Sequence, residues 1–451
     1  MKITFLGGTE TVTGSKFLVE TTTSRVLVDC GLFQGYKWLR ERNWQEPLFD
    51  IKSLDAVILT HAHLDHSGYI PALYKQGYRG PVYTHHATKD LCAILLADSG
   101  HIQEEDAKYY SKHKLGKHAH PQPLYDRATA EESMTLFQSL EFGEIIVVGD
   151  LSFHLQSAGH ILGAGSVILE AEGKRIGFSG DVGRPDDILT LPPKPLPDLD
   201  LLLLESTYGN RRHDTENPYK QLAKIVNEAA QRGGAVLIPS FAVGRAQTLQ
   251  HMLTTLMKSG DIPKLPIYLD SPMAINVSDI YCHYSKLHRL TDEECHRMCQ
   301  TTTYTRSVED SKALAQQHYP HIIIAGSGMA SGGRILHHFK RLLGDPKTTV
   351  LFSGYQAGGT RGAKMLDGAE TVKIHGKWIP IKARVEVLQH LSGHGDYVEI
   401  EQWLKSSDLK KQLSIQLIHG DPEALESMQN YLQSETNFEV DVASYHRTLH
   451  V

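Results

Sequence analysis

The stretch THAHLDHSG, residues 60–68, places three histidines and one aspartate within six positions. His61, His63, Asp65 and His66 are hard to bury without partners, because a polar group withdrawn from water loses its hydrogen bonds. Neutral imidazoles and carboxylates are the usual ligands of zinc in proteins. A polar turn is the alternative interpretation, but a turn does not require so many ligand-type side chains together. The spacing therefore predicts a metal site.

An apolar run, DAVILT at 55–60, precedes the metal-ligand stretch and is typical of a buried strand. Sites in layered α/β folds lie at the carboxyl ends of strands. Three later residues also follow apolar runs and stand beside glycine, namely His160, Asp181 and His419. Each of them alone is as consistent with a structural role as with metal binding. Together with the first stretch they suit two zinc ions, which need about seven protein ligands if open positions remain; manganese is the alternative metal.

The bulk composition indicates a globular protein of more than one domain. A chain of 451 residues exceeds what one core normally supports. The hydrophobic share of 41% and the charged share of 22% argue against disorder. The five cysteines form no CxxC pair, which argues against a disulfide framework and against a cysteine-type zinc site. Neither a signal peptide nor an apolar run of about 18 residues is visible, so we expect a cytoplasmic protein without a membrane anchor.

Charge is distributed unevenly along the chain. Residues 209–376 carry 20 Lys and Arg against 14 Asp and Glu, whereas the remainder carries 26 against 38. Solvated surface charge alone can produce such an asymmetry. A basic middle segment inside an acidic frame nevertheless favours an anionic substrate for that segment.

The pattern of expected elements divides the chain into three segments. Residues 1–208 contain short strands with tight turns, together with helical patterns that extend over 121–140. Residues 209–376 alternate helices and strands, which predicts a parallel sheet. Strand patterns resume over 377–451. We therefore expect one domain, 1–208 and 377–451, interrupted by a second domain at 209–376.

The metal-ligand stretch resembles the HxHxDH signature of the metallo-β-lactamase superfamily. Asp29 in LVDCG, His160, Asp181 and a late histidine match further motifs in the same order. The resemblance implies a four-layer αββα sandwich with a binuclear zinc site at its edge. It implies one metal on His61, His63 and His160, a second metal on Asp65, His66 and His419, Asp181 as the bridge between them, and Asp29 as the residue that orients a ligand imidazole.

Seven motifs, spread over nearly the whole chain, resemble the β-CASP branch of that superfamily, which consists of nucleases. They are LLLLESTYGN, IPSFAVGRAQ, YLDSPMA, SGMASGGR, FSGYQAGGTRG, LSGHGD and LIHGD. The resemblance implies that residues 209–376 form an inserted β-CASP domain with a parallel α/β sheet. It also implies functional roles for Glu205, His394 and His419. A histidine at the position of His419 is associated in this branch with RNA rather than DNA, so we expect RNA as the partner.

The expected reaction is phosphodiester hydrolysis by a hydroxide that two zinc ions generate near neutral pH. The expected catalytic residues are Asp65, His394 and Glu205. His394 would protonate the leaving 3′-oxygen, and Glu205 would orient its ring. His390 is the rival general acid. The products would carry a 5′-phosphate and a 3′-hydroxyl.

Glycine- and serine-rich loops in the basic segment are the expected contacts to the RNA backbone, because small residues expose backbone N–H groups. The residues are Ser240, Arg245, Ser327, Gly328, Ser331, Gly332, Arg334, Ser353, Tyr355 and Gln356. Tyr355 or Phe241 could stack on a base, although core packing is the simpler role for Phe241. The run HKLGKHAH, 113–120, suits a solvated loop or an RNA-contacting rim better than a third metal site.

Several alternatives to a zinc endoribonuclease stay open. They are a 5′-to-3′ exoribonuclease, a DNA nuclease, a small-molecule metallohydrolase and a scaffold protein without activity. The basic insert of about 170 residues speaks against a small substrate, and the full ligand set speaks against a scaffold. The sequence ends at residue 451, short of the longer RNase J type, which disfavours 5′-exonuclease action. A homodimer is one open oligomeric state.

Overall fold

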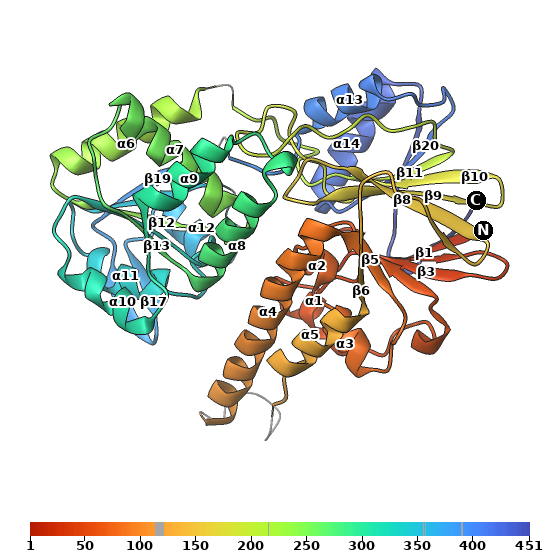
Figure 1. The fold of residues 1–451 in the computed structure, drawn as a ribbon, viewed down its shortest axis with the longest axis horizontal. Helices are drawn as coiled ribbons and strands as arrows, with labels where there is room; N and C mark the ends of the chain where they lie inside the picture. Colours follow the sequence, from red (N-terminus) through yellow and green to blue (C-terminus); the bar gives the residue numbers. More distant parts are fainter. Residues whose placement is uncertain (113–120, 215, 355, 357, 389–390) are drawn as a thin grey trace. The chain divides into compact units, whose positions relative to one another are not determined.

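The computed structural model describes residues 1–112, 121–214, 216–354, 356, 358–388 and 391–451 (Figure 1). Its contacts divide the chain into two compact units. Unit 1 comprises Met1–Asp186, Thr190–Arg212 and His394–Val451, and unit 2 comprises Asp187–Leu189 and His213–Gly393. None of the described helices combines the length and the apolar character needed to cross a membrane.

Unit 1 contains two seven-stranded sheets within the described residues. The first sheet has the order β22-β1-β2-β3-β4-β5-β6, antiparallel from β1 to β3 and parallel from β3 to β6. Its strands are β1 (Lys2–Gly7), β2 (Lys16–Glu20), β3 (Arg25–Val28), β4 (Ala56–Ile58), β5 (Val82–His85), β6 (Phe137–Leu140) and β22 (Thr448–His450).

The second sheet of unit 1 has the order β21-β20-β11-β10-β9-β8-β7. It is antiparallel from β7 to β10 and parallel from β10 through β11 and β20 to β21. Its strands are β7 (Ile146–Val148), β8 (Leu151–Ser157), β9 (Gly165–Ala171), β10 (Lys174–Phe178), β11 (Leu201–Glu205), β20 (Ser414–Ile418) and β21 (Glu439–Val442). Glu205 pairs with Ile418, so the residues that follow these two strands lie at one edge of the sheet.

The two sheets pack face to face, because alternate strand residues point to the same side. Phe5 and Phe17 from the first sheet meet Phe153 and Phe178 from the second in one buried cluster. Helices cover the two outer faces, with α13 and α14 on the second sheet and α2 to α5 beside the first (Figure 1). These helices are α2 (Leu64–Ser67), α3 (Ile70–Lys75), α4 (His86–Lys112), α5 (Arg127–Ser133), α13 (Tyr397–Ser406) and α14 (Pro422–Glu435). The four-layer αββα sandwich is therefore confirmed.

The prediction of a helical segment over 121–140 is wrong for the last part of that range. Only Arg127–Ser133 forms an α-helix; Met134–Leu136 is a 3₁₀ turn and Phe137–Leu140 is strand β6. Phe137 and Leu140 are buried while Gln138 is exposed, and β6 pairs in parallel with β5. Pairing at the sheet edge outweighs the helical pattern of the preceding residues.

Unit 2 is built on a parallel sheet with the order β14-β13-β15-β12-β16-β19 in the described ranges. The strands are β12 (Ala235–Pro239), β13 (Ile267–Asp270), β14 (Thr302–Tyr304), β15 (His321–Ala325), β16 (Thr349–Phe352) and β19 (Arg384–Val387). A hairpin, β17 (Thr371–Ile374) and β18 (Lys377–Pro380), lies beside it. Because β19 pairs with β16, β19 belongs to unit 2. The chain therefore returns from unit 2 to unit 1 between Gly393 and His394 rather than near residue 377.

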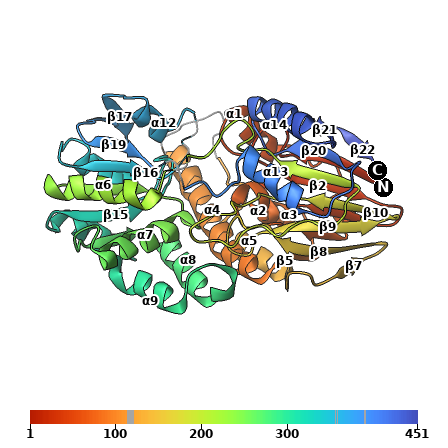
Figure 2. The same cartoon turned by 90° about the horizontal axis from the view of Figure 1, so that it is seen from above.

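Helices cover both faces of the unit 2 sheet (Figures 1 and 2). They are α6 (Pro218–Gln231), α7 (Arg245–Ser259), α8 (Pro272–His283), α9 (Asp292–Thr301), α10 (Val308–Ala313), α11 (Ile335–Leu342) and α12 (Arg361–Leu366). The other short helices within the described residues are α1 (Lys37–Glu41), η1 (Arg42–Trp44), η2 (Ile51–Ser53), η3 (Met134–Leu136), η4 (Ser285–Leu287) and η5 (Leu314–Gln316). The inserted parallel α/β architecture expected from the sequence is confirmed.

Candidate metal centre

Strand ends of unit 1 bring the predicted ligands together at one place. β4 ends just before His61, and α2 begins directly after His63, so its first turn carries Asp65 and His66. His160 lies between β8 and β9, Asp181 follows β10, and His419 follows β20. All seven side chains belong to unit 1. Loops that follow strands of the two sheets therefore bring these seven side chains close together.

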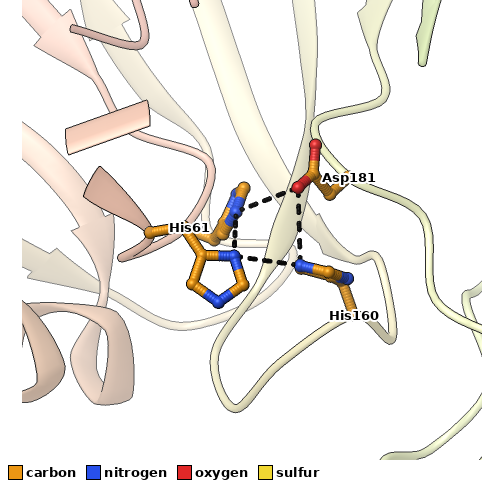
Figure 3. Close-up of side chains that lie close together, drawn as sticks. His61, His160 and Asp181 are labelled. Atoms are coloured by element: carbon orange, nitrogen blue, oxygen red, sulfur yellow. Dashed lines mark hydrogen bonds and ion pairs between the residues drawn. The ribbon is translucent and has the colours of Figure 1, made fainter. Parts of the chain in front are cut away.

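A first group of ligand-type atoms comes from His61, His63, His160 and Asp181, all within 4.8 Å of one another. His63 Nδ1 lies 3.1 Å from both His61 Nε2 and His160 Nε2. Oδ2 of Asp181 lies 3.4 Å from the same two Nε2 atoms, and the side chains point toward one another (Figure 3). Imidazole nitrogens that converge in this way cannot all satisfy one another by hydrogen bonding, so they form a donor set for a cation.

A second group comprises Asp65, His66 and His419. His66 Nε2 lies 3.2 Å from His419 Nε2, which lies 3.5 Å from Oδ2 of Asp65. Oδ1 of Asp181 faces this group, 3.2 Å from His66 Nε2 and 3.4 Å from His419 Nδ1. That oxygen is buried and accepts no hydrogen bond among the described residues. The two oxygens of Asp181 thus face different groups of ligand-type atoms.

Burial keeps the first group of imidazoles neutral. It lowers the pKa of His63 to about 3 and also lowers the pKa of His61 and His160. Neutral imidazole is the form that binds a metal. For Asp181 burial opposes ionisation, but the neighbouring imidazoles of His419 and His66 outweigh it and hold its pKa well below the usual range. The residues present therefore fit a pair of divalent cations such as zinc.

Asp29 fixes the orientation of His66 from behind the centre. Its Oδ1 accepts the backbone N–H of Thr60 over 2.8 Å, and its Oδ2 accepts the hydroxyl of Thr60 over 2.9 Å. The same Oδ2 lies 2.7 Å from His66 Nδ1. A carboxylate only accepts, so Nδ1 of His66 carries the proton and Nε2 points into the centre.

His394 and Glu205 form a second pair at the rim of the same centre. Glu205 is fully buried at the end of β11, and its Oε1 lies 3.0 Å from His394 Nδ1. Nε2 of His394 lies 3.9 Å from Oδ2 of Asp181. Burial disfavours the charged imidazole, but the carboxylates of Glu205 and Asp181 outweigh it and raise the pKa of His394 to about 9. His394 is thus held with a protonated Nδ1 on Glu205 and with Nε2 toward the ligands.

Sequence reasoning missed three hydroxyl residues that hold these side chains. Thr60 donates to Asp29, and Ser179 Oγ accepts the backbone N–H of Glu205. The Thr207 hydroxyl lies 3.1 Å from Nδ1 of His419 and donates to its carbonyl oxygen over the same distance. Hydroxyl residues are frequent and have no spacing rule of their own. Their positions beside ligand motifs, such as Thr207 two residues after Glu205, are the one available signal.

The predicted RNA-contacting residues of unit 2 follow three neighbouring strands. Ser240 comes after β12, Ser327 lies in the loop after β15, and Ser353 comes after β16. The Ser327 hydroxyl accepts the N–H groups of Ser331 and Gly332 over 3.1 and 3.2 Å. The loops touch, because the side-chain amide of Gln356 donates to the carbonyl oxygen of Gly328 over 3.2 Å. Arg245 begins α7 in the same unit.

Arg334 is engaged inside unit 2. It donates to Asp270 Oδ1 over 2.7 Å and to the carbonyl oxygens of Thr305 and Arg306. Tyr355, His390 and the run 113–120 lie outside the described residues.

Three family models match the chain. They are the metallo-β-lactamase superfamily over residues 12–220, the Beta-Casp domain over 246–365, and a Zn-dependent metallo-hydrolase RNA specificity domain over 378–443. The last of these spans β19, α13, β20, α14 and β21.

Relatives of this chain cover nearly all of it. A Thermus thermophilus protein named ribonuclease TTHA0252 is 38% identical over 439 residues, which is 94% of each chain. A Methanocaldococcus jannaschii protein named RNase J-like protein is 31% identical and covers 92% of each chain. The transcription termination factor FttA of the same organism is 32% identical over 93% of this chain and 67% of its own length.

A solved structure shares the fold. A protein of unknown function from Enterococcus faecalis superposes with a TM-score of 0.57 over 99% of both chains at 13% sequence identity. At that identity the likeness concerns the fold alone.

Proposed function

Because this chain belongs to the β-CASP branch of the metallo-β-lactamase superfamily, we propose that it is a metal-dependent ribonuclease acting on single-stranded RNA. The observation that carries the proposal is the position of Asp181, whose two oxygens face separate groups of ligand-type side chains. The RNA specificity domain matched over 378–443 and the name of the Thermus relative support RNA as the substrate. We assign two zinc ions to the centre, with manganese as the alternative metal.

The proposed ligands divide between the two ions. His61, His63 and His160 would hold one ion, Asp65, His66 and His419 the other, and Asp181 both. When bound, such ions supply Lewis acidity toward the phosphoryl oxygens and a water activated near neutral pH. Asp29 keeps Nε2 of His66 aimed at the centre. We also count Asp65 among the catalytic residues, because its carboxylate faces the same centre beside His419.

His394 is the proposed general acid. Its Nδ1–H is held by Glu205, so a second proton on the imidazolium sits at Nε2, the atom that faces the ligand groups. In hydrolysis the oxygen of a water bonds to phosphorus, the bond between phosphorus and the 3′-oxygen breaks, and the 3′-oxygen takes the proton from Nε2 as it leaves. The products are a 5′-phosphate and a 3′-hydroxyl. Glu205 acts through His394 as a positioning residue.

The loops of unit 2 are the proposed contacts to the RNA backbone. The residues assigned to this role are Ser240, Arg245, Ser327, Gly328, Ser331, Gly332, Arg334, Ser353, Tyr355 and Gln356. Three of the loops follow parallel strands at the same edge of the sheet, where backbone N–H groups can meet phosphates. Ser327 and Arg334 contribute by shaping this edge, since their polar groups already bind the protein. We propose endonucleolytic cleavage as the mode of action.

The test is cleavage of a 5′-labelled single-stranded RNA and of DNA with the same sequence by the zinc-loaded chain. We compare the unmodified protein with His394→Ala and with His101→Ala, a control that removes an exposed imidazole from α4. The proposal predicts internal RNA fragments, intact DNA, and a loss of about 10²–10⁴-fold in rate for His394→Ala alone.

Other outcomes of this experiment overturn parts of the proposal. Release of labelled mononucleotide means 5′-exonuclease action. Equal cleavage of DNA removes the RNA preference. No cleavage of either polymer by zinc-loaded protein excludes a nuclease and directs attention to small ester substrates. Normal turnover by His394→Ala removes the assigned acid.

A further inference from the structure

A basic pocket lies in unit 2 between the segment 308–316, which includes α10 and η5, and helix α11. Its volume is about 400 Å³. Figure 1 shows α10 and α11 beside each other in this unit. Five basic residues line it, namely Lys312, Arg334, His337, His338 and Arg341, and no acidic residue is among its described lining residues. None of these residues belongs to the metal centre of unit 1.

A buried carboxylate fixes one wall of the pocket. Asp270 is fully buried at the end of β13. Its Oδ1 accepts from Arg334 over 2.7 Å, and its Oδ2 lies 2.7 Å from Nε2 of His338. The hydroxyls of Thr305 and Ser311 donate to the same two oxygens over 2.7 and 2.6 Å. Asp270 therefore has its hydrogen-bonding capacity filled by these four groups and holds two basic side chains in place.

Arg341 on α11 differs from Asp270 in its hydrogen bonding. Its Nη1 and Nη2 atoms are both buried, and neither has a hydrogen-bond partner within the described part of the chain. Burial lowers the pKa of Arg341 below its ordinary value. A guanidinium stays charged at any physiological pH, and a buried charge without a partner is costly. We therefore expect these two nitrogens to bind an anion from outside the described part of the chain.

We propose that this pocket binds the phosphate group of a nucleotide-sized ligand, with Arg341 as its main contact. The fork of a guanidinium matches two phosphate oxygens. Lys312 is exposed at the rim and adds positive charge, and the exposed ring of His337 offers an N–H donor. Val308 and Ala315 offer apolar surface for a ribose or base. A volume of about 400 Å³ lies within the range of small-ligand sites, roughly 300–1,000 Å³. The proposal does not depend on the ribonuclease function.

Binding of inorganic phosphate, adenosine 5′-monophosphate and adenosine to the full-length zinc-loaded chain tests the proposal by calorimetry. The variant is Arg341→Gln, and the matched control is Lys340→Gln, an exposed neighbour on the same helix that loses the same charge. Because Nη1 and Nη2 of Arg341 have no hydrogen-bond partner among the described residues, we expect the variant to fold. Hydrogen exchange of peptides over 308–316 and 335–342 reports binding at this pocket rather than at the metal centre.

The proposal predicts saturable binding of the two phosphate compounds, protection of those peptides, and about tenfold or greater weakening in Arg341→Gln alone. Adenosine without phosphate does not bind. Equal affinity for inorganic phosphate and the nucleotide assigns the site to free phosphate, and tighter nucleotide binding assigns it to nucleotides. Unchanged affinity and exchange protection in Arg341→Gln, or no protection at either peptide, would overturn the proposal.

Discussion

Replacing Asp29 by asparagine tests how the protein supports one of its two ligand groups. Asp29 has a φ of 59°, a left-handed conformation that asparagine tolerates far better than alanine does. The carboxylate accepts three contacts, two from Thr60 and one from Nδ1 of His66. An asparagine at this position keeps one accepting oxygen. Its amide NH₂ group replaces the other oxygen and then faces a hydrogen-bond donor of Thr60 or His66. The backbone therefore survives, while the anchoring of His66 is lost.

The expected loss follows from which ligands Asp29 touches. Among the described residues it contacts His66 of the second group directly. It reaches His61 of the first group only through the Thr60 hydroxyl, which lies 2.9 Å from Asp29 Oδ2 and 3.1 Å from His61 Nδ1. Losing such a carboxylate partner costs about 10–100-fold in metal affinity, or about 1.4–2.8 kcal/mol. We therefore expect the site that includes His66 to weaken by this factor and the site that includes His61 to weaken less.

A competition titration with a zinc chelator resolves two sites of different affinity and checks this expectation. Asp55→Asn is the control, since the carboxylate of Asp55 accepts from the backbone of Arg25, away from the centre. Equal weakening of both sites in Asp29→Asn, or no weakening of either, would refute the reasoning that this carboxylate supports the second group more than the first.

Three further predictions address activity, stability and backbone packing. Glu205→Gln should keep both metals and the KM for RNA but lower kcat by about 10²-fold, because His394 loses its anionic partner; steady-state kinetics with metal analysis measures this, and an unchanged kcat counts against the pair. Asp270→Asn should lower the free energy of unfolding by about 3–5 kcal/mol near neutral pH, since Arg334 loses a buried partner. Burial opposes ionisation of Asp270, but hydrogen bonds from His338, Ser311, Thr305 and Arg334 outweigh it and hold its pKa below the ordinary 3.8. The stabilisation by the Asp270 carboxylate is therefore complete above pH 3.8 and is lost progressively below it. Denaturant titrations should show the difference in unfolding free energy between variant and wild type shrinking as the pH falls below 3.8, and a constant difference contradicts the assignment. Gly31→Ala should lose metal, because a Cβ there would lie 1.6 Å from the carbonyl oxygen of Asp65 and push α2 away; metal analysis showing full occupancy would contradict this.

The positions of the ligand candidates could be predicted because each follows an apolar strand. His61, Asp181 and His419 come from three strands of two sheets, yet all three strands end at the same edge of the sandwich. Strand ends with polar residues beside glycine are visible in a sequence. The inserted parallel sheet follows in the same way from the alternation of helices and strands, whereas the αββα sandwich was implied by the resemblance of the motifs to the metallo-β-lactamase superfamily.

What the sequence could not reveal depends on partners distant along the chain. Arg334 resembles a phosphate contact in a glycine-rich loop, but its partner Asp270 lies 64 residues earlier. The tautomer of His66 depends on Asp29, 37 residues away, and Thr207 reaches His419 across 212 residues. Phe137–Leu140 became a strand because an open sheet edge was available beside β5. Each of these depends on tertiary packing rather than on local pattern.

Counting the metal ions bound by the unmodified chain and by Asp181→Ala tests most directly whether one carboxylate joins two metal sites. Metal analysis after zinc loading and desalting gives the ratio of zinc to protein. We predict two zinc ions per chain in the unmodified protein and a loss of zinc in the variant, with RNA cleavage lost in parallel. A single zinc ion in the unmodified protein, or full occupancy in Asp181→Ala, would contradict the account.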